Sequence, residues 1–446
     1  MAAMRICILS EYFYPDSTGG TGTVLSKLIR HLKDHHESLE IDVITSRNQF
    51  RGAAGALKPR EDWNGVHITR LKAPAPRKNS MKRRLAANLI FTARALARLV
   101  LVGRRYDLIL VVTAPPTLPM ATRFFSKMSG VPYLYLVYDL YLDMAVAMKM
   151  IPARGRATET LRRVQKDWFR GAAKIVVLGR CMRDHVATTY DLPSEKLHVV
   201  PIPANLEMIT PIAKEETEFR RTHNIDGFLV LYAGNFAQYQ DFDTLLDAAK
   251  LLQHRADIRF AFVGDGAKKA HIAARIADEN LSNTQMLPFL PENQLSDMLS
   301  AADVSLVTLE RGIEGLAVPS KFYNILASGR ATVACVPKAC EVARVIAETG
   351  CGVQVDQEDA PALARVIAEL ADDPQTLIRM GQSARRVCEE RYSFAHVGAQ
   401  FQRIFCEIVE EKRAGKVPRN LATKNENDFI QHIHNDEENS MPAKRI

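Results

Sequence analysis

The sequence predicts an α/β protein with two doubly wound, Rossmann-like domains that face each other across a cleft. The chain has 446 residues, more than one domain usually needs. Short apolar runs alternate with longer helical patterns, which is typical of a parallel sheet covered on both faces. The alternation begins again after Asn205, so we expect two such sheets.

The first half of the chain contains short apolar runs that predict strands. Helical patterns lie between most of them, for example at residues 21–31, 85–102 and 119–130. The predicted strands are residues 5–9, 41–45, 66–70, 108–112, 133–138, 175–177 and 197–200.

The second half repeats the pattern, with helices expected at residues 242–252 and 320–327. The predicted strands are residues 228–232, 259–263, 304–309 and 331–336. The prolines in residues 201–205 interrupt both patterns and predict a hinge. We therefore expect an N-terminal domain at 1–205, a C-terminal domain at 206–391, a long amphipathic helix at 392–412 and a disordered polar tail at 413–446.

Charge is distributed unevenly. Residues 1–205 contain 32 Lys and Arg against 16 Asp and Glu, whereas the rest contains 27 against 35. The basic half favours an anionic partner, most simply a membrane surface, although a solvated basic face would have the same composition. The stretch from Arg77 to Arg105 has nine basic residues and no acidic one, which is typical of an amphipathic helix on anionic lipid. Few aromatic residues accompany these charges, so nucleic acid is disfavoured as a partner.

The seven cysteines are odd in number and form no CxxC pair, which predicts buried free thiols in a reducing compartment. No histidine lies at ligand spacing from Cys335, Cys340 and Cys351, so we expect no metal and no cofactor. No run of ~18 uninterrupted apolar residues predicts a spanning helix, and the N-terminus does not resemble a signal peptide. We expect a cytoplasmic protein, peripheral on the inner face of the membrane.

Glycine-bearing turns follow several predicted strands. Gly19 and Gly20 follow the first strand and precede a helix, whose free amides and dipole favour an anion. Gly234 and Asn235 end the first strand of the second half, where a phosphate can approach the backbone and accept a hydrogen bond. Gly264, at the end of the next strand, is a further candidate to face the ligand that carries this phosphate. Ordinary strand-to-helix turns would also contain such glycines.

The segment Pro319-Ser320-Lys321 is the sharpest feature of the sequence. Pro319 suits the start of a helix, which places Ser320 and Lys321 in its first turn. A lysine there opposes the helix dipole unless an anion binds at the same place. Ser320 adds a hydroxyl donor and Lys321 a point charge, so the segment predicts a diphosphate site. Lys268 is a second cation close enough in sequence to reach a phosphate, with a solvated lysine as the alternative.

Three carboxylates are candidates for catalysis or for binding substrate hydroxyls. Asp139 follows an apolar strand and is predicted to orient or deprotonate an acceptor hydroxyl, with a helix N-cap as the alternative. Glu314 lies in a glycine-bearing loop before residues 319–321 and would hydrogen-bond sugar hydroxyls. Glu310 is a rival for that role.

Taken together, these residues resemble glycosyltransferase family 4, the retaining enzymes of the GT-B fold, over roughly residues 4–412. The likeness is to members that build bacterial capsular, exopolysaccharide and O-antigen units. Its markers are Tyr12-Phe-Tyr-Pro15 with Gly19-Gly20, Tyr232-Ala-Gly-Asn235, Phe262-Val-Gly-Asp-Gly266, Leu287-Pro-Phe-Leu290 and Pro319-Ser-Lys321 running to Ala327-Ser-Gly329.

The resemblance implies that Ser320 and Lys321 bind the diphosphate of a nucleotide-sugar donor. It also implies that Pro288, Phe289 and Leu290 pair with the nucleotide base through their backbone. The Gly19-Gly20 loop would approach the phosphates and the acceptor, and the helix near residue 392 would cross back to the N-terminal domain.

The sequence departs from the family pattern at several positions. Leu316 and Asn324 stand where two glutamates are usual, and Asn324 would still hydrogen-bond a ribose hydroxyl. Asn235 and Gln240 stand where many members have Arg and Lys. Tyr138 replaces a usual His. More of the donor's negative charge should therefore fall to Lys321.

We interpret the chain as a retaining glycosyltransferase that moves a sugar from a UDP- or GDP-sugar to a lipid-linked acceptor in cell-surface polysaccharide or glycolipid biosynthesis. The alternatives are a soluble transferase making a small glycoside, a GT-B-type nucleotide-sugar 2-epimerase, and a sugar-nucleotide-binding subunit without catalysis.

Overall fold

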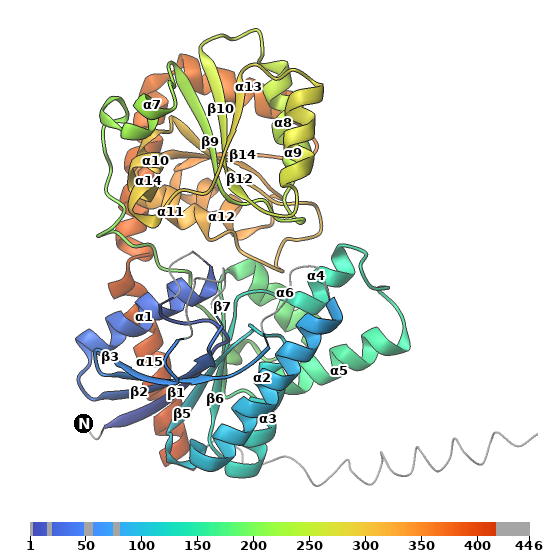
Figure 1. The fold of residues 1–446 in the computed structure, drawn as a ribbon, viewed down its shortest axis with the longest axis vertical. Coiled ribbons are helices and arrows are strands. Elements are labelled where there is room, and N and C mark those ends of the chain that lie inside the picture. Colours follow the sequence, from blue (N-terminus) through green and yellow to red (C-terminus); the bar gives the residue numbers. More distant parts are fainter. Residues whose placement is uncertain (1–2, 16–19, 49–56, 75–80, 416–446) are drawn as a thin grey trace, which may run out of the picture.

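The computed structural model describes residues 3–15, 20–48, 57–74 and 81–415. They form two α/β domains, one above the other in Figure 1, each built around a largely parallel sheet. The two-sheet α/β architecture predicted from the sequence is confirmed.

The sheet of the N-terminal domain has eight strands in the described residues, in the order β3-β4-β2-β1-β5-β6-β7-β8. Neighbours pair in parallel except β3, which runs antiparallel to β4. The strands are β1 (Met4–Leu9), β2 (Leu39–Ser46), β3 (Arg60–Trp63), β4 (Val66–Leu71), β5 (Leu108–Val112), β6 (Tyr133–Val137), β7 (Lys174–Val177) and β8 (Leu197–Val199). The helices are α1 (Thr21–His35), α2 (Met81–Val102), α3 (Leu118–Ser129), α4 (Tyr141–Ala147), α5 (Arg156–Gly171) and α6 (Arg180–Tyr190).

The sheet of the C-terminal domain has six parallel strands in the described residues, in the order β11-β10-β9-β12-β13-β14. The strands are β9 (Phe228–Asn235), β10 (Ile258–Asp265), β11 (Thr284–Leu287), β12 (Val304–Thr308), β13 (Ala331–Cys335) and β14 (Gly352–Val355). The helices are α7 (Glu218–Thr222), α8 (Phe242–Leu251), α9 (Lys269–Asp278), α10 (Leu295–Ala301), α11 (Lys321–Ala327), α12 (Glu341–Thr349), α13 (Ala360–Asp372), α14 (Pro374–Arg391) and α15 (Phe394–Arg413).

The strands that the sequence did not predict, β3, β11 and β14, each lie at the edge of a sheet. Central strands such as β5 and β6 are buried along their whole length and therefore form continuous apolar runs. An edge strand buries less: β3 alternates between exposed and half-buried residues, and every residue of β11 is half-buried. Without a continuous apolar run, an edge strand gives little signal in the sequence.

The strand order of each sheet turns back on itself once. The reversal lies between β1 and β5 in the first sheet and between β9 and β12 in the second. Ligands of open parallel sheets bind beyond the carboxyl ends of the strands at such a reversal. Asp139, after β6, forms a short antiparallel bridge with Ala317, after β12, so these carboxyl edges face each other.

The chain passes between the domains twice at one place. Ala204 follows the last strand of the first sheet, and its N–H donates to the carbonyl of Tyr392 at 2.8 Å. Ala204 also forms a parallel bridge with Ser393, the residue that caps α15 by accepting from the N–H of His396. Helix α15 then runs down beside the N-terminal domain and packs against α1 and β5 (Figure 1).

Ion pairs and hydrogen bonds also join the two domains. Arg180, at the start of α6, pairs with Glu341 of α12 at 3.0 Å, and the backbone N–H of Arg180 donates to the same carboxylate at 2.6 Å. Lys27 of α1 pairs with Glu292, and Arg344 of α12 lies 3.3 Å from Asp184.

The segment Lys82–Arg105, which includes most of helix α2, is long and apolar enough to cross a membrane by length and composition alone. The sequence contains no uninterrupted apolar run of that length, since Arg94 and Arg98 divide it. Phe91, Ala95 and Leu99 of this helix are buried in the core, and α2 packs on α3. In this fold α2 is a covering helix of the first sheet.

Candidate active site

Asp139 lies where the two domains meet. Its bridge to Ala317 is extended by the N–H of Leu140, which donates to the carbonyl of Leu316 at 3.0 Å. Burial raises the pKa of the Asp139 carboxyl to about 6. Burial, together with the charge of Asp139, also raises the pKa of Tyr239, which precedes α8 in the other domain. The predicted acceptor-side carboxylate thus faces both domains.

Lys321 is the first residue of α11, and its side chain reaches back to β9. Its Nζ lies 3.4 Å from the centroid of the Tyr232 ring, and a Cβ at Gly234 would lie 3.3 Å from the same nitrogen. Among the described residues this buried nitrogen has no hydrogen-bond partner. Burial lowers the pKa of the amine well below its usual value. Two predicted donor residues, Gly234 and Lys321, are therefore neighbours.

The other predicted residues of α11 lie at its start and one turn further on. Ser320 directly precedes the helix, is exposed, and caps no backbone amide within the described part of the chain. Asn324 is half-buried three residues after Lys321, so the two share a side of the helix. Leu316 is 3% exposed, and its carbonyl is bonded to Leu140. Neither family-glutamate position supplies a carboxylate here.

The glycines at the ends of β9 and β10 are explained partly by close packing. Gly264 pairs with Gly234 in the sheet, and a Cβ at Gly264 would lie 1.9 Å from the Gly234 carbonyl oxygen. The sequence expectation was that Gly264 faces the donor; the structure gives it this contact between strands. Asn235 is exposed at the end of β9, and its Oδ1 would lie 2.7 Å from a Cβ at Gly266.

Gly20 begins the first helix of the N-terminal domain. Its φ of 86° is a conformation that favours glycine, and a Cβ there would meet no atom within 4 Å. Its carbonyl accepts from the N–H of Val24 in the first turn of α1. Gly19, the other predicted member of this loop, lies outside the described residues.

Glu314 is held in the loop between β12 and α11. A Cβ at Gly315 would lie 2.9 Å from the carbonyl oxygen of Cys181, so this loop packs closely on α6 of the N-terminal domain. The Oε2 atom of Glu314 is buried and has no hydrogen-bond partner among the described residues. A buried carboxylate oxygen without a partner is costly, and a sugar hydroxyl would satisfy it.

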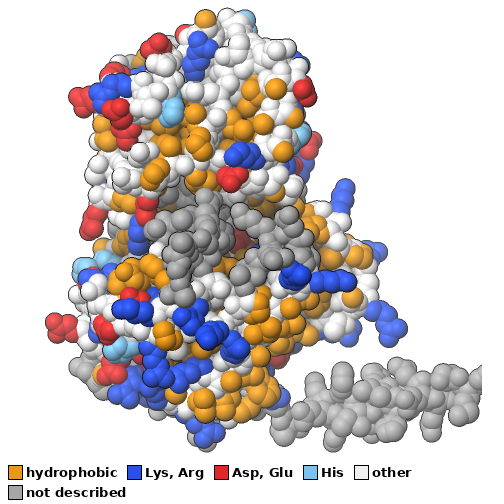
Figure 2. Space-filling view, in the orientation of Figure 1, with side chains coloured by type: hydrophobic (Ala, Val, Ile, Leu, Met, Phe, Trp, Pro, Cys, Tyr) orange, Lys and Arg blue, Asp and Glu red, His pale blue; other side chains and the backbone are white. Residues whose placement is uncertain are grey.

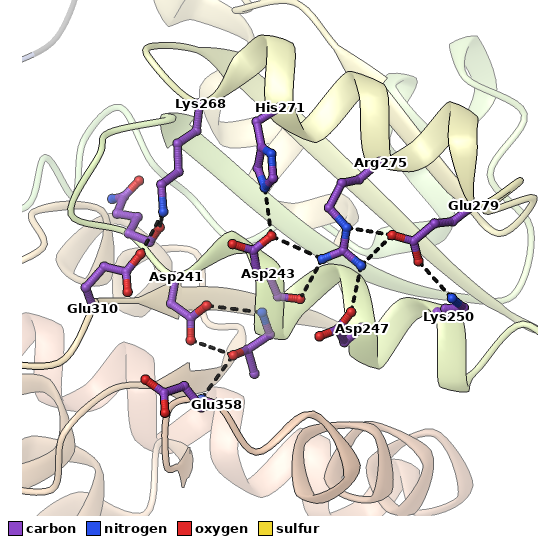
Figure 3. A network of polar contacts seen from close by, with 12 residues as sticks. Asp241, Asp243, Asp247, Lys250, Lys268, His271, Arg275, Glu279, Glu310 and Glu358 are labelled. Carbon is purple, nitrogen blue, oxygen red and sulfur yellow. Dashed lines mark hydrogen bonds and ion pairs between the residues drawn. The ribbon is translucent and has the colours of Figure 1, made fainter.

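Lys268 and Glu310, two further candidates from the sequence, are bound to each other at 2.6 Å (Figure 3). Lys268 also donates to the carbonyl of Gln240 at 2.7 Å. The Gln240 side-chain oxygen accepts from the Tyr232 hydroxyl and from the N–H of Ala237. These groups support the β9–α8 loop and occupy Lys268, whereas the Lys321 amine beside Gly234 has no hydrogen-bond partner among the described residues.

The residues predicted to hold the base follow β11. Pro288 and Phe289 are exposed and Leu290 is half-buried. Because β11 is parallel to β10, these residues continue from the same carboxyl edge as Gly234 and Gly264. Their role in holding the base stays a prediction.

Glu11 is a candidate that the sequence reasoning missed. It follows β1, beside the strand reversal of the first sheet, and is 8% exposed. Burial raises the pKa of its carboxyl to about 7. Burial, and to a smaller extent the negative charges of Asp139 and Glu11, raise the pKa of the Tyr141 hydroxyl, so both carboxylates lie near this side chain. The feature of the sequence that points to Glu11 is its position directly after the first strand.

Two family models match this chain and together span most of it. Residues 19–203 match the glycosyl transferase 4-like domain, and residues 213–387 match glycosyl transferases group 1. The chain belongs to the glycosyltransferases that combine these two domains in a GT-B fold.

Two relatives and one solved structure are similar to this chain. The chain is 28% identical to the probable glycosyltransferase WbjE of Pseudomonas aeruginosa, covering 87% of this chain and 94% of that protein. It is 23% identical to the putative colanic acid biosynthesis glycosyl transferase WcaI of Escherichia coli K12, covering 82% and 92%. The structure of HepE from Anabaena in complex with UDP-glucose superposes with a TM-score of 0.66 at 14% identity, covering 91% and 100%.

Proposed function

We propose that the protein transfers a sugar, with retention of anomeric configuration, from a nucleoside-diphosphate sugar to a lipid-linked acceptor in the biosynthesis of cell-surface polysaccharide or glycolipid. The observation that carries this proposal is the buried amine of Lys321, which lies beside Gly234 without a hydrogen-bond partner in the described residues. A diphosphate would supply the missing acceptor and the opposite charge. The relative WcaI is named for colanic acid biosynthesis, and HepE binds UDP-glucose in its solved structure.

On this proposal the donor lies along the carboxyl edge of the second sheet. Lys321, Ser320 and the amide of Asn235 bind the diphosphate, and Gly234 lets it approach β9. The backbone of residues 288–290 binds the base, and Asn324 a ribose hydroxyl. The buried oxygen of Glu314 accepts a hydrogen bond from the sugar.

The reaction would follow a front-face course. The acceptor oxygen bonds to the anomeric carbon on the side from which the diphosphate oxygen departs, and the departing phosphate takes the acceptor proton. Lys321 then stabilises the charge that develops on the leaving diphosphate. Asp139 orients the acceptor hydroxyl. The proposal requires no metal ion.

The acceptor side is assigned to the basic N-terminal domain. We expect α2, with the basic residues between Arg77 and Arg105, to contact an anionic membrane from the cytoplasmic side, where a lipid-linked acceptor would be presented. Residues 75–80 of this stretch lie outside the described part of the structure.

A thermal-shift panel of UDP- and GDP-sugars tests donor binding, because a ligand that binds only the folded state must raise the melting temperature. Transfer from the stabilising donor should then fall by about 100-fold or more in Lys321→Ala. An unchanged rate would contradict the site. Conversion of the donor without any acceptor would instead support the epimerase alternative.

A further inference from the structure

Three helices of the N-terminal domain present large apolar side chains to solvent. Helices α2, α3 and α5 pack side by side in this order. Figure 2 shows apolar side chains bordered by Lys and Arg over this part of the molecule. The exposed apolar residues are Leu85, Leu89, Ile90, Val100 and Leu101 on α2, Met120, Phe124 and Met128 on α3, and Leu161 and Val164 on α5. Contiguous apolar surface rimmed by charge marks a protein or membrane contact.

A groove runs between α3 and α5 within this surface and encloses about 440 Å³. On α3, Met120 and Phe124 are four residues apart and so lie on one side of the helix. On α5, Val164 and Trp168 have the same spacing and line the opposite wall of the groove. Lys127 continues the α3 side one turn beyond Phe124. The groove is thus apolar along its length and basic at its borders.

The charges of the groove favour an anion. Arg123 makes two 3.0 Å hydrogen bonds to the carboxylate of Asp167, so that pair is neutral as a unit. Arg163 also lines the groove and adds a positive charge. The C-terminal domain has no comparable excess, since residues 206–446 contain more acidic than basic side chains.

We propose that the groove between α3 and α5 binds an anionic phospholipid of the membrane, with the phosphate at Arg163 and an acyl chain against Phe124 and Val164. The membrane contact then extends across three helices instead of α2 alone. A tryptophan at the groove wall fits this occupant, because Trp168 has both an apolar ring and an N–H suited to the bilayer interface. The inference rests on the membrane association in the proposed function and adds a lipid site to it.

The direct test places a reporter in the groove without changing its walls. The chain has two tryptophans, so Trp63→Phe leaves Trp168 as the sole tryptophan. Vesicles of phosphatidylglycerol with brominated acyl chains should quench its fluorescence, whereas vesicles of brominated phosphatidylcholine should quench it much less. Vesicle binding without quenching of Trp168 would overturn the groove.

Variants test the same site by a second route. In flotation with phosphatidylglycerol-containing vesicles, Phe124→Ser/Val164→Ser should bind at least ten-fold more weakly, and Arg163→Gln about five-fold. The matched control is Leu251→Ser/Ile378→Ser on the C-terminal domain, whose side chains are 49% and 51% exposed, against 52% and 38% in the groove. The control should bind like the wild type. Equal loss in control and groove variants would contradict the proposal.

The possible failures can be told apart. If Leu101→Ser on α2 loses vesicle binding and the groove variant keeps it, the membrane contact stands and the groove is wrong. If the wild type binds no vesicles, both are wrong, while the thermal shift and the transfer assay still test donor binding and sugar transfer. If light scattering finds a wild-type dimer that the groove variant converts to monomer, a second copy of the chain occupies the groove and the lipid proposal fails.

Discussion

The Nζ of Lys321 lies 3.4 Å from the centre of the Tyr232 ring and has no hydrogen-bond partner among the described residues. The contact joins the first residue of α11 to the middle of β9, the strand beside the reversal of the second sheet. An amine held in this way can accept a proton when an anion arrives. Donor binding and protonation should therefore be linked.

The first prediction concerns this proton. Burial lowers the pKa of Lys321, and a bound diphosphate would raise it again, so binding of UDP should take up a proton from the buffer above the lowered pKa. Calorimetric titration with UDP in two buffers of different ionisation enthalpy measures the uptake. Lys321→Met should abolish it and weaken binding at least ten-fold. Lys269→Met, an exposed lysine nearby, is the control.

The second prediction is that Lys321→Met stabilises the protein although it removes activity. A buried amine without a partner is costly, and its removal should gain about 1–3 kcal/mol at neutral pH. The folded pKa lies below the unfolded value of 10.5, so folding releases a proton between those two pKa values. The advantage of Met should therefore shrink as the pH rises towards 10.5. Urea unfolding over this pH range measures it, and a destabilised variant would contradict the unpartnered state.

The third prediction concerns Glu11. Burial raises its pKa from 4.5 to about 7, so the folded protein binds a proton that the unfolded chain lacks between these values. Stability should fall as the pH rises through this window, and Glu11→Gln should remove the loss. The variant should gain up to about 3 kcal/mol of unfolding free energy above pH ~7 and little below pH ~4.5. Equal unfolding free energies for Glu11→Gln and the wild type at pH ~8 would contradict the raised pKa.

The fourth prediction links Asp139 to the pH profile of transfer. If its ionised carboxylate orients the acceptor, kcat/KM should fall as the pH drops below about 6, the raised pKa of this group. Asp139→Asn should lose this acid limb and lower kcat/KM about 100-fold at neutral pH. Donor-induced thermal stabilisation should persist in the variant. An acid limb that remains in the variant must belong to another group.

The fifth prediction tests the packing of β9 on β10. Gly264→Ala would place a Cβ 1.9 Å from the Gly234 carbonyl oxygen, so we expect a loss of about 3 kcal/mol or more. Gly155→Ala is the matched control, because its φ of 154° is close to the 158° of Gly264 but no atom lies within 4 Å of its Cβ. The control should lose only the roughly 1–3 kcal/mol that the backbone conformation costs an alanine, and the larger loss in Gly264→Ala measures the clash. Chemical unfolding of both variants measures it.

The sequence predicted the central strands because buried parallel strands must be apolar along their length, and it predicted some of the helices between them. It did not predict β3, β11 and β14, which lie at sheet edges, although β8 at another edge was predicted. Gly234 and Lys321 were each assigned to the donor phosphates from the sequence, and the structure places them next to each other.

Contacts between loops that are far apart in the chain could not be predicted from the sequence. Lys268 seemed free to meet a phosphate, but it pairs with Glu310, which is 42 residues away. Gln240 occupies the position of a family cation, and the structure gives it the role of holding Tyr232 and Ala237. Glu11 became a candidate because the fold buries it beside the strand reversal and thereby raises the pKa of its carboxyl. Such contacts depend on three-dimensional closeness, which periodicity does not encode.

The double passage of the chain at Ala204 and Tyr392 has a mechanical consequence. Two backbone segments joined by a 2.8 Å hydrogen bond hold the domains together at this place, so we expect an opening motion to turn about it. The bridge between Asp139 and Ala317 joins the domains through two other segments of the chain. A rotation that separates these segments to release a product would have to break this bridge and then form it again.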